Sequence, residues 1–132
     1  MKIANIISWA LRITIAAIYM QTLYFKFTAH PDSVYIFSKL GVEPYGRIGL
    51  GIAELITSVL ILVPGTKIAG LFASFGIICG ALVSHFMVLG TEVKGDGGGL
   101  LALAIVVFLA CVVLFIMSGN EIKNLIVKFT KK

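Results

Sequence analysis

Four long apolar stretches constrain the fold of this chain more than any other feature of its sequence. They run over residues 6–27, 47–63, 68–89 and 99–117. A helix needs about 20 apolar residues, with a range of about 17 to 25, to cross a bilayer. Of all residues, 13% are charged and 59% are hydrophobic, whereas a soluble domain has about 25% charged residues. We therefore predict an all-α fold, an integral membrane four-helix bundle that forms a single transmembrane domain over residues 1–132.

The segment between the first two stretches, residues 30–46, is too short and too polar to cross a membrane. Pro31 suits the first turn of a helix and Gly41 suits its end. One side of such a helix would be apolar and would consist of Val34, Ile36, Phe37 and Leu40. We predict a short helix that lies at the membrane interface between spans one and two.

Two loops have clear turn signals. Residues 64–67, Pro-Gly-Thr-Lys, predict a tight turn that makes spans two and three antiparallel. Asp96 precedes the fourth span in a glycine-rich loop, and a carboxylate there suits the free N–H groups and the positive dipole end of a helix. A phosphate-binding loop is the alternative for these glycines.

The net charge of +5 is spread along the chain rather than gathered in a basic face, so we expect no nucleic-acid partner. Four of the eleven Lys and Arg residues lie in the last ten residues, a pattern typical of anchoring at an anionic leaflet. Lys2, Lys67 and these C-terminal lysines lie on one side of the predicted bundle. The positive-inside rule then places both termini in the cytoplasm. Arg12, within the first span, is expected to extend toward this side.

Cys79 and Cys111 both lie in apolar stretches. The sequence has no Cys-x-x-Cys pair and no Cys/His spacing typical of zinc, so we expect no metal site. We interpret both cysteines as small core residues.

Glu54 is a single acid within the otherwise apolar residues 48–63. A charge at the centre of a membrane helix costs about 2.5–3.5 kcal/mol on insertion scales. A group that is kept at such a cost has a partner or a task. Arg47, Gly51, Glu54 and Ser58 are spaced by four, three and four residues, so they share one stripe of the helix.

Five polar residues from three spans reach similar depths in the outer half of the predicted bundle. With a rise of 1.5 Å per residue, Glu54, Gln21 and His85 lie about 10, 9 and 7 Å from the outer ends of their helices. Lys26 and Arg47 lie at the outer rim. We therefore predict a polar pocket that opens to the periplasm and is built from Gln21, Lys26, Arg47, Glu54 and His85.

The roles of these residues have alternatives. Glu54 is either charged and paired with Lys26 or Arg47, or else protonated. His85 would pass protons or hydrogen-bond a ligand oxygen, and Gln21 is expected to hydrogen-bond between helices. The alternative to a pocket is a buried ion pair that only fixes the register of the helices.

The third predicted span carries a face of small residues. Gly76, Gly80 and Ser84 repeat every four residues, and His85 lies at the edge of this face. Small residues let membrane helices approach closely. This face therefore permits close contact with another helix, and together with the interfacial helix it would supply the contacts of a docking subunit.

Several short motifs, taken in order, resemble the DoxX-like family of small four-helix membrane proteins. They are Phe25-Lys26-Phe27, then Leu40-Gly41-Val42-Glu43-Pro44 after the short helix, then Gly51-Ile52-Ala53-Glu54-Leu55. The His85 region and residues 95–98 are similar to the tail of the same pattern, and the likeness covers about residues 8–117.

The resemblance implies four transmembrane helices, with both termini on the cytoplasmic side of a bacterial-type inner membrane. It also implies that Lys26 and Glu54 are the family's polar positions and that Gly51 is its helix-packing glycine. The family is named after a quinone-reducing thiosulfate oxidoreductase, and its relatives are linked to redox chemistry or to the assembly of membrane proteins. This chain departs from a thiol-redox pattern because it lacks paired cysteines near the periplasm.

Three functions are compatible with these observations, with the lipid bilayer as a partner in each, and whether the chain is an enzyme is left open. The first is an accessory subunit that docks to another membrane protein or to a second copy, because so short a chain has little room for a catalytic domain. The second is a quinone-linked oxidoreductase subunit that holds a quinone, as its cofactor, between His85, Glu54 and Lys26. The third is a carrier for a small solute, coupled to protons through the buried carboxylate.

Overall fold

The computed structural model describes residues 2–131, and every regular element in them is helical. The α-helices are α1 Ile3–Phe27, α2 Pro31–Lys39, α3 Tyr45–Leu62, α4 Lys67–Ser84, α5 Gly99–Met117 and α6 Gly119–Thr130. A 3-10 turn, Pro64–Thr66, joins α3 to α4, and a π-helical turn, His85–Leu89, extends α4. In this part of the chain, four helical segments are long and apolar enough to cross a membrane, namely α1, α3, Pro64–Leu89 and α5.

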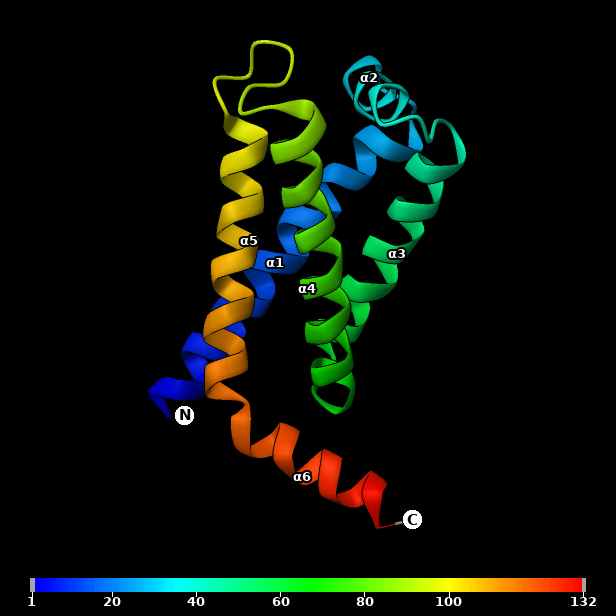
Figure 1. Cartoon of the computed structure of the whole chain (residues 1–132). Helices are drawn as coiled ribbons and strands as arrows, with labels where there is room; N and C mark the ends of the chain where they lie inside the picture. Colours follow the sequence, from blue (N-terminus) through cyan, green and yellow to red (C-terminus); the bar gives the residue numbers. More distant parts are fainter. Residues whose placement is uncertain (1, 132) are drawn as a thin grey trace.

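The four long segments run alternately up and down the bundle (Figure 1). α1 packs against α3 and α5, and α4 packs against the same two helices, so α1 and α4 are diagonal neighbours. α2 lies at the end where α1 stops and α3 starts, and we call this half of the bundle the α2 half. Both termini and α6 lie at the opposite end (Figure 1).

The outward faces of the long helices are apolar. Large exposed side chains on them include Ile13, Ile52, Ile56, Val59, Phe72, Val83, Leu109, Val113 and Ile116. A soluble monomer rarely exposes contiguous apolar patches beyond a few hundred Å². Together with the lengths of the helices, this surface indicates a multi-pass membrane protein.

The half of the bundle farther from α2 is closely packed. The hydrophobic core extends from this half into the α2 half and is formed by Ile15, Ala16, Tyr19, Ile61, Leu71, Ile78, Ala104, Val107, Ala110, Cys111 and Leu114. Within it the Tyr19 hydroxyl lies 3.0 Å from Ser74 Oγ, which lies 3.3 Å from Cys111 Sγ. Cys111 is a buried core residue as predicted, whereas Cys79 is half-buried, and both are free thiols.

Two arginines join α1 to α3 reciprocally. Arg12 of α1 donates from Nε to the carbonyl of Ile61 at 2.7 Å and from Nη2 to that of Leu62 at 3.1 Å, at the C-terminal end of α3. Arg47 of α3 donates from Nη1 to the carbonyl of Lys26, at the C-terminal end of α1. The last carbonyls of a helix lack intrahelical donors and form the negative end of its dipole. Each arginine therefore caps the neighbouring helix. Arg12 thus bonds to the end of α3 that lies on the side of the termini, and it is buried there rather than exposed to water.

The helices make their closest contacts at Gly51 and Gly70, and not at the glycines of the small-residue face. A Cβ atom on Gly70 would lie 2.5 Å from the backbone nitrogen of Ile61, and one on Gly51 would lie 2.7 Å from the Phe27 ring. In contrast, a Cβ atom on Gly76 or Gly80 would meet no atom within 4 Å. Within the described residues, Gly76 and Gly80 therefore make no close contact with another helix, because these glycines face open space.

The contact at Gly70 can be tested with a pair of substitutions within α4. We expect Gly70→Ala to destabilise the fold by about 1–3 kcal/mol, the usual cost of overpacking, because the added methyl meets the backbone of α3. Gly80→Ala is the matched control and should stabilise α4 by about 0.5–1 kcal/mol, because alanine loses less backbone entropy than glycine. Unfolding of both variants in mixed detergent micelles checks the prediction. Equal effects at the two positions would contradict it.

Two elements were not predicted. α6 is an amphipathic helix in a region that we interpreted only as a basic tail, although Ile122, Leu125, Ile126 and Phe129 have helical spacing. The π-helical turn at His85 has no recognisable signal in the sequence. The predicted helix after Pro31 is present as α2.

Candidate functional site

A cavity of about 740 Å³ occupies the α2 half of the bundle. Its apolar walls come from five helices and include Ile18, Phe25, Phe37, Leu50, Ile77, Ile78, Leu89, Leu100 and Leu103. Gly76, Gly80 and Ser84 line one side of it, so the small-residue face of α4 makes room for the cavity. Its volume lies within the range of about 300–1,000 Å³ that is usual for small-molecule sites.

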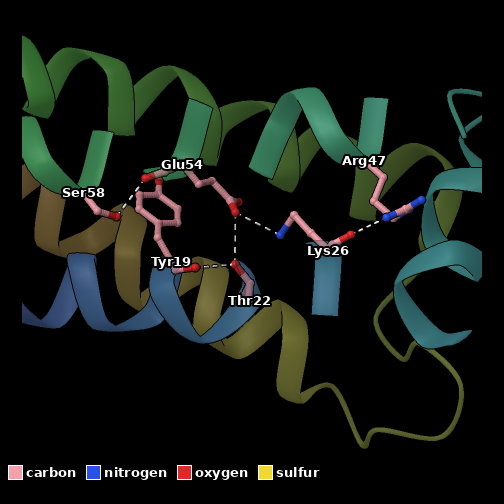
Figure 2. A network of polar contacts seen from close by, with 6 residues as sticks. All are labelled: Tyr19, Thr22, Lys26, Arg47, Glu54 and Ser58. Atoms are coloured by element: carbon pink, nitrogen blue, oxygen red, sulfur yellow. Dashed lines mark hydrogen bonds and ion pairs between the residues drawn. The ribbon is translucent and has the colours of Figure 1, made fainter. Parts of the chain in front are cut away.

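An ion pair between α1 and α3 forms the polar part of the wall (Figure 2). Lys26 Nζ lies 3.0 Å from Glu54 Oε2, and the Thr22 hydroxyl donates to the same oxygen at 3.1 Å. Lys26 and Glu54 are both buried. Of the two predicted partners for Glu54, the structure therefore selects Lys26.

This ion pair keeps hydrogen-bonding capacity for a ligand. An ammonium has three donors and a carboxylate has about four acceptor sites. Within residues 2–131, Glu54 Oε2 is the one side-chain oxygen within bonding distance of Lys26 Nζ, and Glu54 Oε1 accepts no hydrogen bond. A molecule in the cavity can therefore accept a hydrogen bond from Lys26 and donate one to Glu54.

His85 is fixed on another wall of the cavity by Gly90. Its Nδ1 lies 3.0 Å from the carbonyl oxygen of Gly90, and the Gly90 N–H donates to the carbonyl of His85. A carbonyl oxygen only accepts hydrogen bonds, so Nδ1 carries the hydrogen, and Nε2 of the neutral ring is an acceptor. His85 is buried and lines the cavity, where it adds an acceptor to those of Glu54.

The other two predicted site residues differ in position. Gln21 lines the cavity. Arg47 lies outside it, with Nε 2.8 Å from Glu43 Oε1, one turn earlier along the chain, and with Nη1 bonded to the carbonyl of Lys26 (Figure 2). The structure therefore brings Gln21, Lys26, Glu54 and His85 to one cavity. Arg47 does not line this cavity, and its link to the cavity is the hydrogen bond to the end of α1 that carries Lys26.

Three polar residues of the cavity wall lie outside the predicted spans. Asp32 and Ser33 come from α2, and Asp96 comes from the loop 90–98. Lys94 of this loop lies 3.0 Å from Asp32 Oδ1, so an ion pair joins the loop to α2. No local sequence signal could have found these residues, because their position depends on how α2 folds back over the bundle.

Asp96 organises the loop before α5, as predicted for a helix cap. Its Oδ1 accepts from the N–H groups of Val93 and Gly98, and its Oδ2 accepts from that of Leu100. These hydrogen bonds, with that of Val93 the strongest influence, lower the pKa of the Asp96 carboxyl below its ordinary value. A carboxyl whose pKa is lower in the folded state stabilises the loop above its unfolded pKa of about 3.9, and this contribution is lost as the pH falls through the folded pKa.

Amide hydrogen exchange tests this role of Asp96. In Asp96→Asn, an NH₂ group replaces Oδ2, so we expect the Leu100 amide to exchange faster than in the wild type near neutral pH. The difference should shrink as the pH falls through the folded pKa of Asp96, because the protonated acid then resembles asparagine. A difference that does not change with pH would contradict this role.

Comparisons of the chain with protein-family models, with curated proteins and with solved structures find no match. The assignment of a function therefore depends on the geometry of the cavity.

Proposed function

We propose that the chain is a multi-pass inner-membrane protein of the DoxX-like type that binds a lipid-soluble molecule with an oxygen-bearing head, of the quinone class, in the cavity of its α2 half. The observation that carries the proposal is the cavity of about 740 Å³, whose apolar walls surround the Lys26–Glu54 pair. An ion pair whose role is only to fix the register of the helices does not require a cavity of this volume beside it. In this proposal the chain is an accessory subunit, and a partner membrane protein exchanges electrons with the bound molecule.

The same proposal includes an orientation in the bilayer. Lys2, Lys67 and the lysines of α6 belong to the end that carries both termini, which favours the cytoplasmic side for that end. The cavity then lies in the periplasmic half, and α2 lies at the periplasmic interface. Phe37 of α2 is buried against the bundle, whereas Tyr35 and Lys39 are exposed, an arrangement suited to an interfacial helix.

The polar residues of the cavity suit the oxygen atoms of a quinone ring. A bound quinone supplies a two-electron, two-proton couple. Lys26 can donate to a ring oxygen, and Glu54 Oε1 can accept from a ring hydroxyl and take its proton. His85 Nε2 is a second acceptor. The apolar walls exclude water from the ring and provide a surface for a hydrocarbon tail.

The packing of the bundle favours this proposal over a carrier. A solute pathway would have to continue through the half of the bundle that is farther from α2. In that half Ile15, Ile61, Val107 and Leu114 fill the centre with almost no exposed surface. The cavity therefore ends within the bundle, in the form of a binding site rather than of a pathway.

Ligand retention tests the proposal. The protein is purified in mild detergent, its bound small molecules are identified by native mass spectrometry with lipid extraction, and decylubiquinone is added in a parallel thermal-stability measurement. We expect a quinone to copurify and added decylubiquinone to stabilise the fold, by about 2.7 kcal/mol at a concentration 100 times the Kd. Gly80→Leu should reduce both effects because its side chain projects into the cavity, and Glu54→Gln should weaken both.

Gly49→Leu is the matched control. Gly49 is exposed, is not part of the cavity wall, and has no atom within 4 Å of a Cβ position. This variant should retain the quinone. If the wild type yields no quinone and decylubiquinone leaves its stability unchanged, the proposal is wrong. If Gly80→Leu retains the quinone as fully as the wild type does, the quinone binds elsewhere.

A further inference from the structure

α6 has almost no contact with the rest of the chain. Ser118 alone separates it from α5, and α6 leaves the bundle there and runs below the other helices (Figure 1). No residue of α6 is buried. Lys67 Nζ, at the start of α4, lies 2.9 Å from Glu121 Oε1, and this ion pair holds the first turn of α6. The helix is therefore attached at its first turn, and residues 123–130 after it are all exposed.

One face of α6 is apolar and exposed. Ile122, Leu125, Ile126 and Phe129 are spaced as i, i+3, i+4 and i+7, which places them on one side of a helix. The exposed fraction is 37% for Leu125, 57% for Ile126 and 69% for Phe129. A water-exposed apolar face of this kind needs a cover, because burying apolar surface lowers the free energy by about 25 cal/mol per Å².

The charges of α6 indicate which cover fits. Lys123 and Lys128 lie on either side of the apolar face, and Lys131 follows the helix. The single acid of the segment, Glu121, is paired with Lys67. Lysines that flank an apolar face can bury their methylene chains and keep the ammonium groups at the level of lipid phosphates.

We propose that α6 binds the surface of an anionic lipid bilayer, with its apolar face in the boundary between head groups and acyl chains and with Lys123 and Lys128 on the lipid phosphates. The position of α6 supports this occupant, because a helix that starts directly after a membrane span begins at the bilayer surface. The inference depends on the membrane placement in the proposed function but not on the cavity. The inference implies that the leaflet on the α6 side of the membrane contains anionic lipid.

Tryptophan quenching by brominated lipid tests the proposal on the full chain. Trp9 is the single tryptophan, so Trp9→Phe provides a dark background. Phe129→Trp then reports on the apolar face, and Asn124→Trp, on the opposite face, is the matched control. Each protein is reconstituted into vesicles with bromine on the acyl chains, made of phosphatidylcholine alone or with phosphatidylglycerol. We expect Phe129→Trp to lose most of its fluorescence in the anionic vesicles and Asn124→Trp to lose little.

The lysines should contribute to this association. Each basic residue near an anionic surface contributes about fivefold to the ratio of bound to free helix. Lys123→Gln with Lys128→Gln should therefore reduce the quenching of Phe129→Trp, and so should the change to neutral vesicles. Ile126→Trp, on the same face, replaces Phe129→Trp if the latter does not fold.

Several results would overturn the proposal. Equal quenching at the two faces would mean that α6 is immersed in lipid rather than lying at its surface. Quenching that is the same in neutral and anionic vesicles would mean that the lysines of α6 do not contribute to its binding. A blue-shifted emission without bromine quenching would mean that a protein partner or a second copy, rather than lipid, covers the apolar face of α6. Resistance to carbonate extraction is measured on the same vesicles, so a chain that fails to insert is distinguished from an α6 that fails to bind.

Discussion

Lys26→Met should destabilise the folded chain by about 3–5 kcal/mol, the usual cost of removing one partner from a buried ion pair. The side chains of Lys26 and Glu54 are only 11% and 6% exposed, so Glu54 would lose its partner at a site with little contact with bulk water. The double variant Lys26→Met with Glu54→Gln should recover most of this loss, because it leaves no buried charge. Unfolding of the two single variants and the double variant in mixed micelles, analysed as a double-mutant cycle, gives the coupling energy.

Lys39→Met is the control for Lys26→Met, because Lys39 is an exposed lysine at the end of α2. If Lys26→Met is no more destabilising than Lys39→Met, the pair does not contribute to the fold as its burial suggests. The double variant also separates stability from function. A protein that is as stable as the wild type but no longer retains a quinone would indicate that the pair is kept for the ligand.

Arg12→Met is expected to destabilise the protein by about 3 kcal/mol or more, because hydrogen bonds from a charged group contribute about 1.5–3 kcal/mol each. Arg12 donates two of them, to the carbonyls of Ile61 and Leu62, and its guanidinium lies 4.0 Å from the centre of the Trp9 ring. Removing it leaves the last carbonyls of α3 without these donors in the interior. Thermal unfolding in detergent, with residual helix followed by circular dichroism, measures the loss.

Arg12→Lys distinguishes capping from charge alone. Lysine keeps the positive charge near the end of α3 but lacks the planar fork that reaches two carbonyls at once. It should therefore restore only part of the stability. Lys2→Met, which removes an exposed charge at the same end of α1, is the control and should have little effect. If Arg12→Lys is as stable as the wild type, the electrostatic attraction to the helix end is sufficient and the two hydrogen bonds are not required.

The long helices could be predicted because their signals are local. Runs of apolar residues of about the length that crosses a bilayer, together with the turn signals at Pro64 and Gly65, are sufficient to locate them. The helix after Pro31 and the capping role of Asp96 follow from similar local rules. α6 has an equally local signal, the helical spacing of its four apolar residues. The prediction for this region used its charges alone and therefore did not include a helix.

The polar residues of the candidate site could be predicted as a set but not as a geometry. Depth along each helix placed Gln21, Lys26, Glu54 and His85 in the same half of the bundle. It could not decide between Lys26 and Arg47 as the partner of Glu54. That choice depends on the contact of α1 with α3, in which Arg47 is bonded to Glu43 and to the end of α1.

The sequence by itself determined the number and length of the long helices, the tight turn between α3 and α4, and the apolar surroundings of Glu54. The tertiary structure alone decided that Gly70 rather than Gly80 is the point of close contact, that Arg12 caps α3, and that a cavity lies beside the Lys26–Glu54 pair. The physical reason is that spacing along a helix sets the direction of each side chain around its own axis. The separation and rotation of neighbouring helices depend instead on contacts between residues far apart in the chain, and these contacts determine whether a face of small residues meets another backbone or an open space.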